Sequence, residues 1–317
     1  MQASLLKNLF FVILLSSCVS SSRNGKQALS DSPIDEISSS EPFITSDQKP
    51  LSLMDLPQSE NGGFVLAPGF YEAEFKTYCL QPGTPDPSQG DAYLQGPITG
   101  YRKDIIESVL LNSKGQPQMD QKNIQLLLWS VVSNSNFNKL SSHVQADAMK
   151  LLTPKQVFQL KGGVAGVIKT VSNSTNLFNA DKGMQNLFEK GISSYESFER
   201  IAVLKEQSKI TRKNVKYDQW YKQNENYYIR YFPVSYKKVR VQVYVPDSLM
   251  DAKNKINGEY LVFDPTGQQA IPAFTNAQRL GIGAPVVVDV VRAVIKVNKG
   301  TSTPKKVPKK NDPKVVS

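Results

Sequence analysis

Alternating apolar and polar positions near residue 75 predict a half-buried strand. One side of that strand carries Tyr71, Ala73, Phe75, Thr77 and Cys79, and the other carries Glu72, Glu74 and Lys76. Because successive side chains of a strand point to opposite faces, Cys79 is expected to end the buried row. The next segment, LQPGTPDPSQGD, contains three prolines and two glycines, so the strand is expected to end in a loop.

The hydrophobic period then changes to that of helices. Residues 103–112 place apolar side chains on one side, and Asp120 is positioned to cap a helix that runs to about Val132. Further helices are predicted between residues 140 and 206. Strand patterns return at 226–232, 237–245, 259–263 and 286–297. The sequence therefore predicts an α+β protein with a mixed strand and helix N-terminal half, residues 64–207, and a β-rich C-terminal half, residues 208–298.

The ends of the chain differ in composition from this body. Residues 1–17 combine Lys7, an apolar run and small residues, which is the order of an export signal. Residues 18–63 are rich in serine, aspartate and proline and predict a disordered tether. The last segment, 299–317, holds six lysines against one aspartate and is also expected to be disordered.

The signal ends in a motif of its own. Leu15-Ser16-Ser17-Cys18 resembles the bacterial lipobox, in which the signal is cut before the cysteine and the cysteine is lipid-modified. The resemblance implies a lipoprotein with acyl chains, palmitate among them, on Cys18, which would hold the protein at a membrane without a spanning helix. Val19 stands where an aspartate would imply inner-membrane retention, so the outer membrane is expected. The alternative is an ordinary secreted protein that loses Cys18 with its leader.

Charge and histidine content limit the chemistry. The net charge is +10, which favours anionic neighbours in the cell envelope or at the surface, whereas an exported chain without a nucleic-acid motif predicts no nucleic-acid partner. His143 is the single histidine, and no spacing of histidines and cysteines predicts a metal or cofactor site.

Two residues stand out as candidates for chemistry. Once the signal is processed, Cys79 is the one free thiol of the chain, and the helix that follows Asp120 carries Gln125 on an apolar stripe with Leu128, Trp129 and Val132. A buried carboxamide without a hydrogen-bond partner costs about 1–3 kcal/mol, so Gln125 is expected to meet a polar group in the interior.

Tyr78-Cys79 on a strand and Ile124-Gln125 followed by Trp129 on a helix resemble the two motifs of thioester domains in bacterial surface adhesins. The resemblance implies that the Cys79 sulfur is joined to the Gln125 side-chain carbonyl with loss of ammonia. Such a bond stores an electrophile that can capture a partner covalently, which would make the protein a binding or adhesion lipoprotein. Ile124 and Leu127 depart from the threonine and alanine of the family's helical motif.

Three alternatives remain open from the sequence. Cys79 and His143 could form the dyad of a cysteine hydrolase or transferase. Cys79 could instead be a small buried hydrophobe, with Gln125 bonded to a neighbouring loop. The protein could also be a non-catalytic structural component of the envelope.

Overall fold

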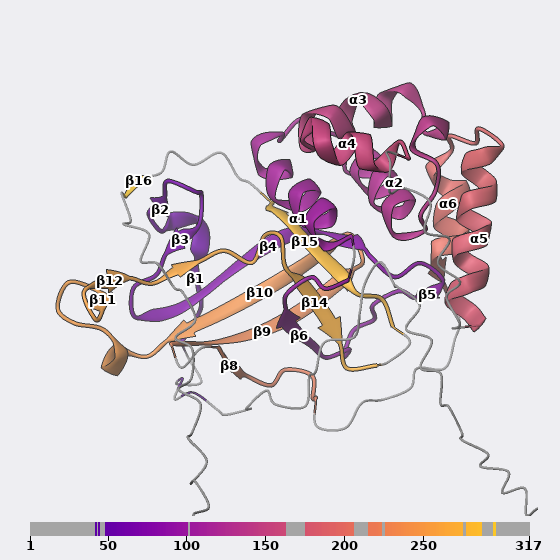
Figure 1. Cartoon of the computed structure of the whole chain (residues 1–317). Coiled ribbons are helices and arrows are strands. Elements are labelled where there is room, and N and C mark those ends of the chain that lie inside the picture. Colours follow the sequence, from indigo (N-terminus) through magenta and orange to yellow (C-terminus); the bar gives the residue numbers. More distant parts are fainter. Residues whose placement is uncertain are drawn as a thin grey trace, which may run out of the picture.

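The computed structural model describes residues 42, 44, 48–100, 102–162, 175–205, 215–223, 226–274, 277–286 and 294–295, and for 175–179 it describes the backbone alone. Helices dominate the first part of this chain and strands the second, so the predicted α+β class is confirmed. Figure 1 shows the helices gathered over one end of the main sheet. The signal segment 1–17, Cys18 and the basic tail 299–317 lie outside the described residues.

The main sheet joins strands from both ends of the chain. Its order is β6-β14-β15-β4-β10-β9-β8, with β1 paired to β4 in addition. The bounds are β1 Leu51–Ser52, β4 Gly69–Cys79, β6 Tyr93–Gly96, β8 Tyr221–Gln223, β9 Tyr227–Ser235, β10 Lys238–Val245, β14 Gln269–Pro272 and β15 Leu280–Pro285. Apart from the parallel β1–β4 pair, these pairings are antiparallel.

Strand β4 lies in the middle of this sheet because its predicted alternation matches that of β10. Val239 faces Phe75 and Val241 faces Ala73 in the antiparallel register, which aligns the two apolar rows on one face. The charged positions Glu72 and Glu74 fall on the other face, where they pair with Arg240 and Lys238. The strand predicted from Tyr71 to Cys79 is therefore confirmed, with its inward row buried.

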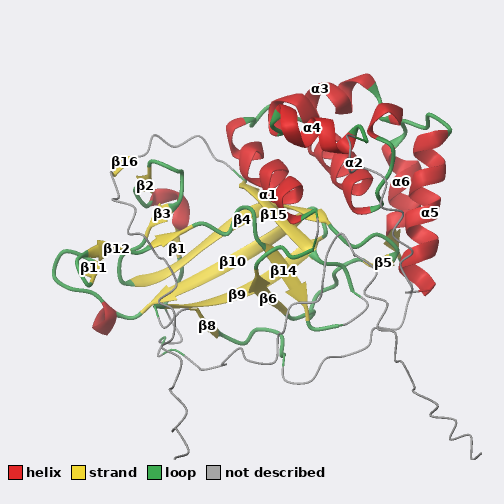
Figure 2. Ribbon diagram, viewed as in Figure 1, coloured by secondary structure: helices red, strands yellow, loops and turns green. Residues whose placement is uncertain are grey.

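The helices form a separate layer at the end of the sheet (Figure 2). Their bounds are α1 Lys103–Asn112, α2 Gln121–Val132, α3 Ser142–Leu151, α4 Pro154–Leu160, α5 Thr175–Glu189 and α6 Tyr195–Ala202. Asp120 caps α2 as predicted, because its carboxylate accepts a hydrogen bond from the backbone N–H of Lys122. Both α1 and α2 contact the central strands, so they cover the end of β4 that carries Cys79.

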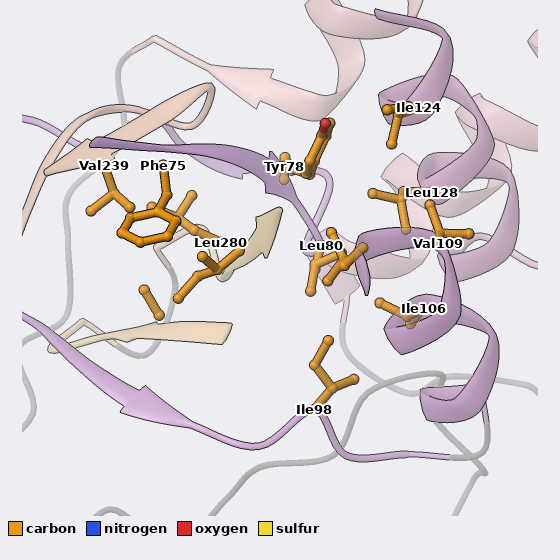
Figure 3. Close-up of a cluster of buried hydrophobic side chains, with 14 of the residues drawn as sticks. Phe75, Tyr78, Leu80, Ile98, Ile106, Val109, Ile124, Leu128, Val239 and Leu280 are labelled. Atoms are coloured by element: carbon orange, nitrogen blue, oxygen red, sulfur yellow. The ribbon is translucent and has the colours of Figure 1, made fainter. Parts of the chain in front are cut away.

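The core is continuous between the sheet and the first two helices. Figure 3 shows Tyr78 and Leu80 at the end of β4, with Ile124 and Leu128 of α2 and Ile106 and Val109 of α1 along the helices beside them. All six side chains are buried. Each Å² of apolar surface that this packing removes from water stabilises the fold by about 25 cal/mol. These buried contacts therefore fix where α2 lies against the strand.

Ordered structure starts before the point expected from composition. Within the predicted tether 18–63, β1 pairs with β4, and Leu53 and Met54 of the 3-10 helix Leu53–Asp55 are buried in the core. The apolar cluster in LSLMDL explains the difference, because it buries enough surface to order the segment despite the polar residues around it. The described part of the segment after residue 48 is therefore part of the fold.

Short strands complete the structure. One small sheet has the order β13-β3-β2-β16, and two further pairs join β5 to β7 and β11 to β12. The bounds are β2 Gln58–Ser59, β3 Phe64–Val65, β5 Thr84–Pro85, β7 Val203–Leu204, β11 Lys255–Ile256, β12 Glu259–Tyr260, β13 Val262–Phe263 and β16 Val294–Ile295, with further 3-10 turns at Ser113–Gly115, Phe137–Lys139 and Asp247–Leu249.

The boundary expected between residues 207 and 208 falls between segments that share one sheet. Strand β4, from the first segment, pairs with β10 and β15, both from the second. Side chains from both segments also belong to one buried cluster. The β-rich half thus supplies the strands on either side of the one that carries Cys79.

Candidate functional site

Cys79 lies at the end of β4, where its two neighbouring strands behave differently. On one side, β15 begins opposite it, with Leu280 facing Cys79 in the antiparallel register. On the other side, the pairing of β10 ends with Lys238 opposite Lys76, and the last strand hydrogen bond runs from Thr77 N–H to the Lys237 carbonyl. The backbone N–H and C=O of Cys79 therefore point to an edge where no strand of the described residues pairs with them.

Helix α2 completes that edge with glutamine side chains. Gln125 Oε1 accepts a hydrogen bond from the Cys79 N–H at 2.8 Å, and Gln125 Nε2 donates to the Cys79 C=O at 3.0 Å. One turn earlier, Gln121 Nε2 donates to the carbonyls of Thr77 at 3.1 Å and Lys237 at 2.8 Å. Four residues of a helix and two residues of a strand each extend about 6 Å along their axes. The spacing of the two glutamines on α2 therefore matches that of Thr77 and Cys79 on the strand.

The prediction that Gln125 is directed inward is confirmed. Gln125 is 2% exposed and Cys79 is 0% exposed, and their hydrogen bonds join residues 46 positions apart. The two backbone groups and the sulfur of Cys79 all branch from one Cα, so the carboxamide is held beside the residue that carries the thiol. The expected pair of residues is thus brought together, and both ends of the amide are satisfied.

Burial controls the acidity of the thiol. It raises the pKa of Cys79 from 9.0 to about 12, and the negative charge of Asp86 acts in the same direction. The Trp129 side chain and the backbone N–H of Gln81 oppose this shift, because both stabilise negative charge on sulfur. At neutral pH the free thiol is protonated and shielded, which makes it a poor target for oxidants.

Aromatic side chains cover the sulfur side of the site. The ring of Trp129 stacks on Tyr195 of α6, with centroids 5.4 Å apart, and lies 6.5 Å from the ring of Tyr236. The hydroxyls of Tyr195 and Tyr236 are 2.6 Å apart, and Tyr236 also donates to Glu199. The sequence pattern gave no signal for this cover, because Tyr195 and Tyr236 come from a helix and a strand turn far from either motif.

Two lysines lie against the cover. Lys237 Nζ is 5.6 Å from the centre of the Tyr195 ring and forms an ion pair with Glu199 at 2.9 Å. Lys122 Nζ is 5.1 Å from the same ring and pairs with Glu196. The two ammonium groups therefore contact the aromatic cover and its carboxylates, in the manner of cation–π pairs.

His143 lies elsewhere. Its side chain is exposed on α3 and lines an open cleft of about 390 Å³ that also includes Asn123 and Asp147. Asn123 donates to Asp147 from the face of α2 that meets α3, two positions and about 200° around the helix from Gln125. Helix α2 thus stands between His143 and Cys79, and the structure does not assemble the alternative dyad.

Other candidate features are absent from the described part of the chain. No group of three or more histidine, cysteine, aspartate or glutamate side chains there could hold a metal ion. None of the helices in the described ranges is both long and apolar enough to cross a membrane. The lipidation candidate Cys18 falls outside the described residues, so it stays a prediction.

Comparisons of the chain with protein-family models, with curated proteins and with solved structures find no match.

Proposed function

We propose that this protein is a lipid-anchored envelope lipoprotein that binds or adheres to a partner and carries an internal thioester between Cys79 and Gln125. The observation that supports it is the paired hydrogen bonding of the Gln125 carboxamide to the backbone of Cys79 inside a closed site. These hydrogen bonds hold the carboxamide against the backbone of the residue whose side chain carries the thiol, in a site that excludes water, and such proximity favours intramolecular acyl transfer.

The bond would form in one balanced exchange. The Cys79 sulfur attacks the side-chain carbonyl carbon of Gln125, the thiol proton passes to the amide nitrogen, and ammonia leaves. Negative charge develops on Gln125 Oε1 in the intermediate, and the Cys79 N–H already donates to that oxygen at 2.8 Å. Residue 79 therefore supplies both the nucleophile and a donor for the oxyanion.

During capture of a partner, the Cys79 sulfur would be the leaving group instead of the nucleophile. A nucleophile on the partner, such as an amine, attacks the same carbonyl carbon, forms a bond to Gln125, and releases the Cys79 thiol. The aromatic cover formed by Trp129, Tyr195 and Tyr236 has to open for this step, while in the closed state it protects the bond from hydrolysis. Burial of the pair fits a bond that must survive until a partner arrives.

The envelope location is the second part of the proposal. It rests on the lipobox residues before Cys18 and on the net charge of +10, which favours anionic neighbours in the envelope or on a surface. In cells, a labelled fatty acid should be incorporated into the wild-type protein. The Cys18→Ala variant should carry no label, and equal labelling of the two would remove the lipoprotein from the proposal.

Intact mass tests the thioester. A protein that starts at residue 19 should have a mass about 17 Da below the mass calculated from its sequence, because ammonia has left. The Cys79→Ala and Gln125→Met variants should each have the mass of their sequence. A wild-type protein of full mass, whose Cys79 reacts with a thiol reagent as soon as it is unfolded, would show that the pair is joined by hydrogen bonds alone and has a structural role.

A further inference from the structure

The indole N–H of Trp129 is a buried donor that the fold leaves without a hydrogen-bond partner. The side chain is 0% exposed, and no acceptor within the described residues meets hydrogen-bond geometry with its Nε1. Leaving such a donor unpaired costs about 1–3 kcal/mol, and a phenylalanine of similar shape would avoid that cost. The N–H therefore calls for a role that a purely apolar ring does not have.

Its position relates it to the Cys79 sulfur. Trp129 follows Gln125 by one helical turn on α2, and its ring is held by stacking on Tyr195. The pKa of the Cys79 thiol is lowered by Trp129 and by the backbone N–H of Gln81, against the larger effect of burial. Gln125 is bonded to the backbone of Cys79, so the next turn of the same helix face brings Trp129 to the same residue.

We infer that Trp129 is a catalytic residue of the proposed thioester chemistry, donating its indole N–H to the Cys79 sulfur whenever that sulfur carries negative charge. The inference rests on the proposed function and adds a specific residue to it. During formation, the donor stabilises the attacking sulfur after its proton moves toward the amide nitrogen. During capture, it stabilises the departing thiolate until that thiolate takes the proton released by the incoming amine.

The resting geometry agrees with this role. A neutral thiol is a weak acceptor, so the N–H gains little by closing on it. A thiolate is charged, and hydrogen bonds to charged groups are shorter and about twice as strong. A contact that is loose in the ground state and tightens in the transition state lowers the barrier, whereas one equally tight in both does not.

Nuclear magnetic resonance tests the contact without requiring a thioester. The chain contains two tryptophans, Trp129 and Trp220, so a ¹⁵N-labelled sample gives two indole N–H signals. Trp129→Phe assigns them. Cys79→Ala should shift the Trp129 signal and leave that of Trp220 in place, because Trp220 packs against Phe70 and Tyr244. An unmoved Trp129 signal would overturn the inference.

Kinetics test the catalytic role. Trp129→Phe keeps an aromatic ring against Tyr195 but removes the N–H, so its reaction with methylamine, followed by mass, should be about 10- to 100-fold slower than in wild type. Trp220→Phe, the matched control, should react at the wild-type rate. Equal rates in Trp129→Phe and wild type would overturn the inference while leaving the thioester intact.

The two proposals fail in different ways. A wild-type protein of full mass would refute the thioester and, with it, the catalytic role of Trp129. A shifted indole signal in the Cys79→Ala variant of such a protein would then assign the N–H to a structural contact with the thiol.

Discussion

Replacing Gln125 by methionine should destabilise the protein more than any comparable change on the same helix. Methionine has a similar shape but makes neither hydrogen bond, so the N–H and the C=O of Cys79 lose their partners at once. Both lie in a site from which water is excluded, since Cys79 is 0% exposed. At about 1–3 kcal/mol for each buried group left unpaired, and some relaxation, the expected loss is about 2–5 kcal/mol.

The measurement is best made in the Cys79→Ala background. No thioester can form there, while the backbone groups that Gln125 contacts are unchanged, so the free energy of unfolding reports the hydrogen bonds alone. Urea unfolding followed by both circular dichroism and fluorescence supplies that free energy, and coincidence of the two curves supports a two-state analysis.

Gln121→Met is the matched control. Gln121 lies one turn from Gln125 on α2, and its replacement also removes two hydrogen bonds. These bonds lie in part at the surface, where water can replace the amide. Its expected cost is about 0.5–1 kcal/mol. If Gln125→Met costs no more than Gln121→Met, the helix does not complete the sheet edge in the way described, and the argument for a preorganised site loses its basis.

Other predictions concern stability. Burial raises the pKa of Asp181 from 3.8 to about 7, so the contribution of its neutral form is present below the unfolded pKa and lost as pH rises through 7. The Asp181→Asn variant should therefore melt at a higher temperature than wild type at pH 8, by the equivalent of about 2–4 kcal/mol. The melting temperatures of variant and wild type should converge near pH 4. A Cβ on Gly283 would lie 2.6 Å from the Tyr78 ring, so Gly283→Ala should cost about 1–3 kcal/mol in urea unfolding, whereas Gly115→Ala, with open space around it, should not. Tyr236→Phe removes the hydroxyl that bonds to Tyr195 and Glu199 and should lower the free energy of unfolding by about 1–2 kcal/mol. Tyr217 is 40% exposed, so Tyr217→Phe should change thermal stability little. A larger loss in Tyr217→Phe than in Tyr236→Phe would show that the hydroxyl network adds no stability.

Local patterns predicted much of this fold because they are set by near neighbours in sequence. The alternation from Tyr71 to Cys79, the valine row of β10 and the Asp120 cap all appear as expected. Strands β6, β14 and β15 were not expected, because YLQG, QAIP and LGIGAP are short and contain the glycine or proline typical of loops. Their strand structure comes from pairing with distant segments, which a local pattern does not record.

The candidate site shows the same division. The motifs predicted that Cys79 and Gln125 belong together, and the structure brings them into contact. The sequence pattern does not predict that the Gln125 amide bonds to the backbone of Cys79. That contact depends on β10 ending opposite Lys76, which leaves the backbone of Cys79 open. The roles of Gln121, Tyr195 and Tyr236 likewise depend on where α2 and α6 pack, which no residue spacing reveals.

The glutamines of α2 also affect how this protein behaves beside copies of itself. An open strand edge offers unpaired N–H and C=O groups to any extended segment of another molecule, and this is a common route into β-aggregates. Here the Gln125 amide occupies the N–H and the C=O of Cys79, and the Gln121 amide occupies the C=O of Thr77, so a foreign strand finds nothing to pair with at that place. Variants that loosen α2 should thus become prone to association, even where the rest of the sheet stays folded.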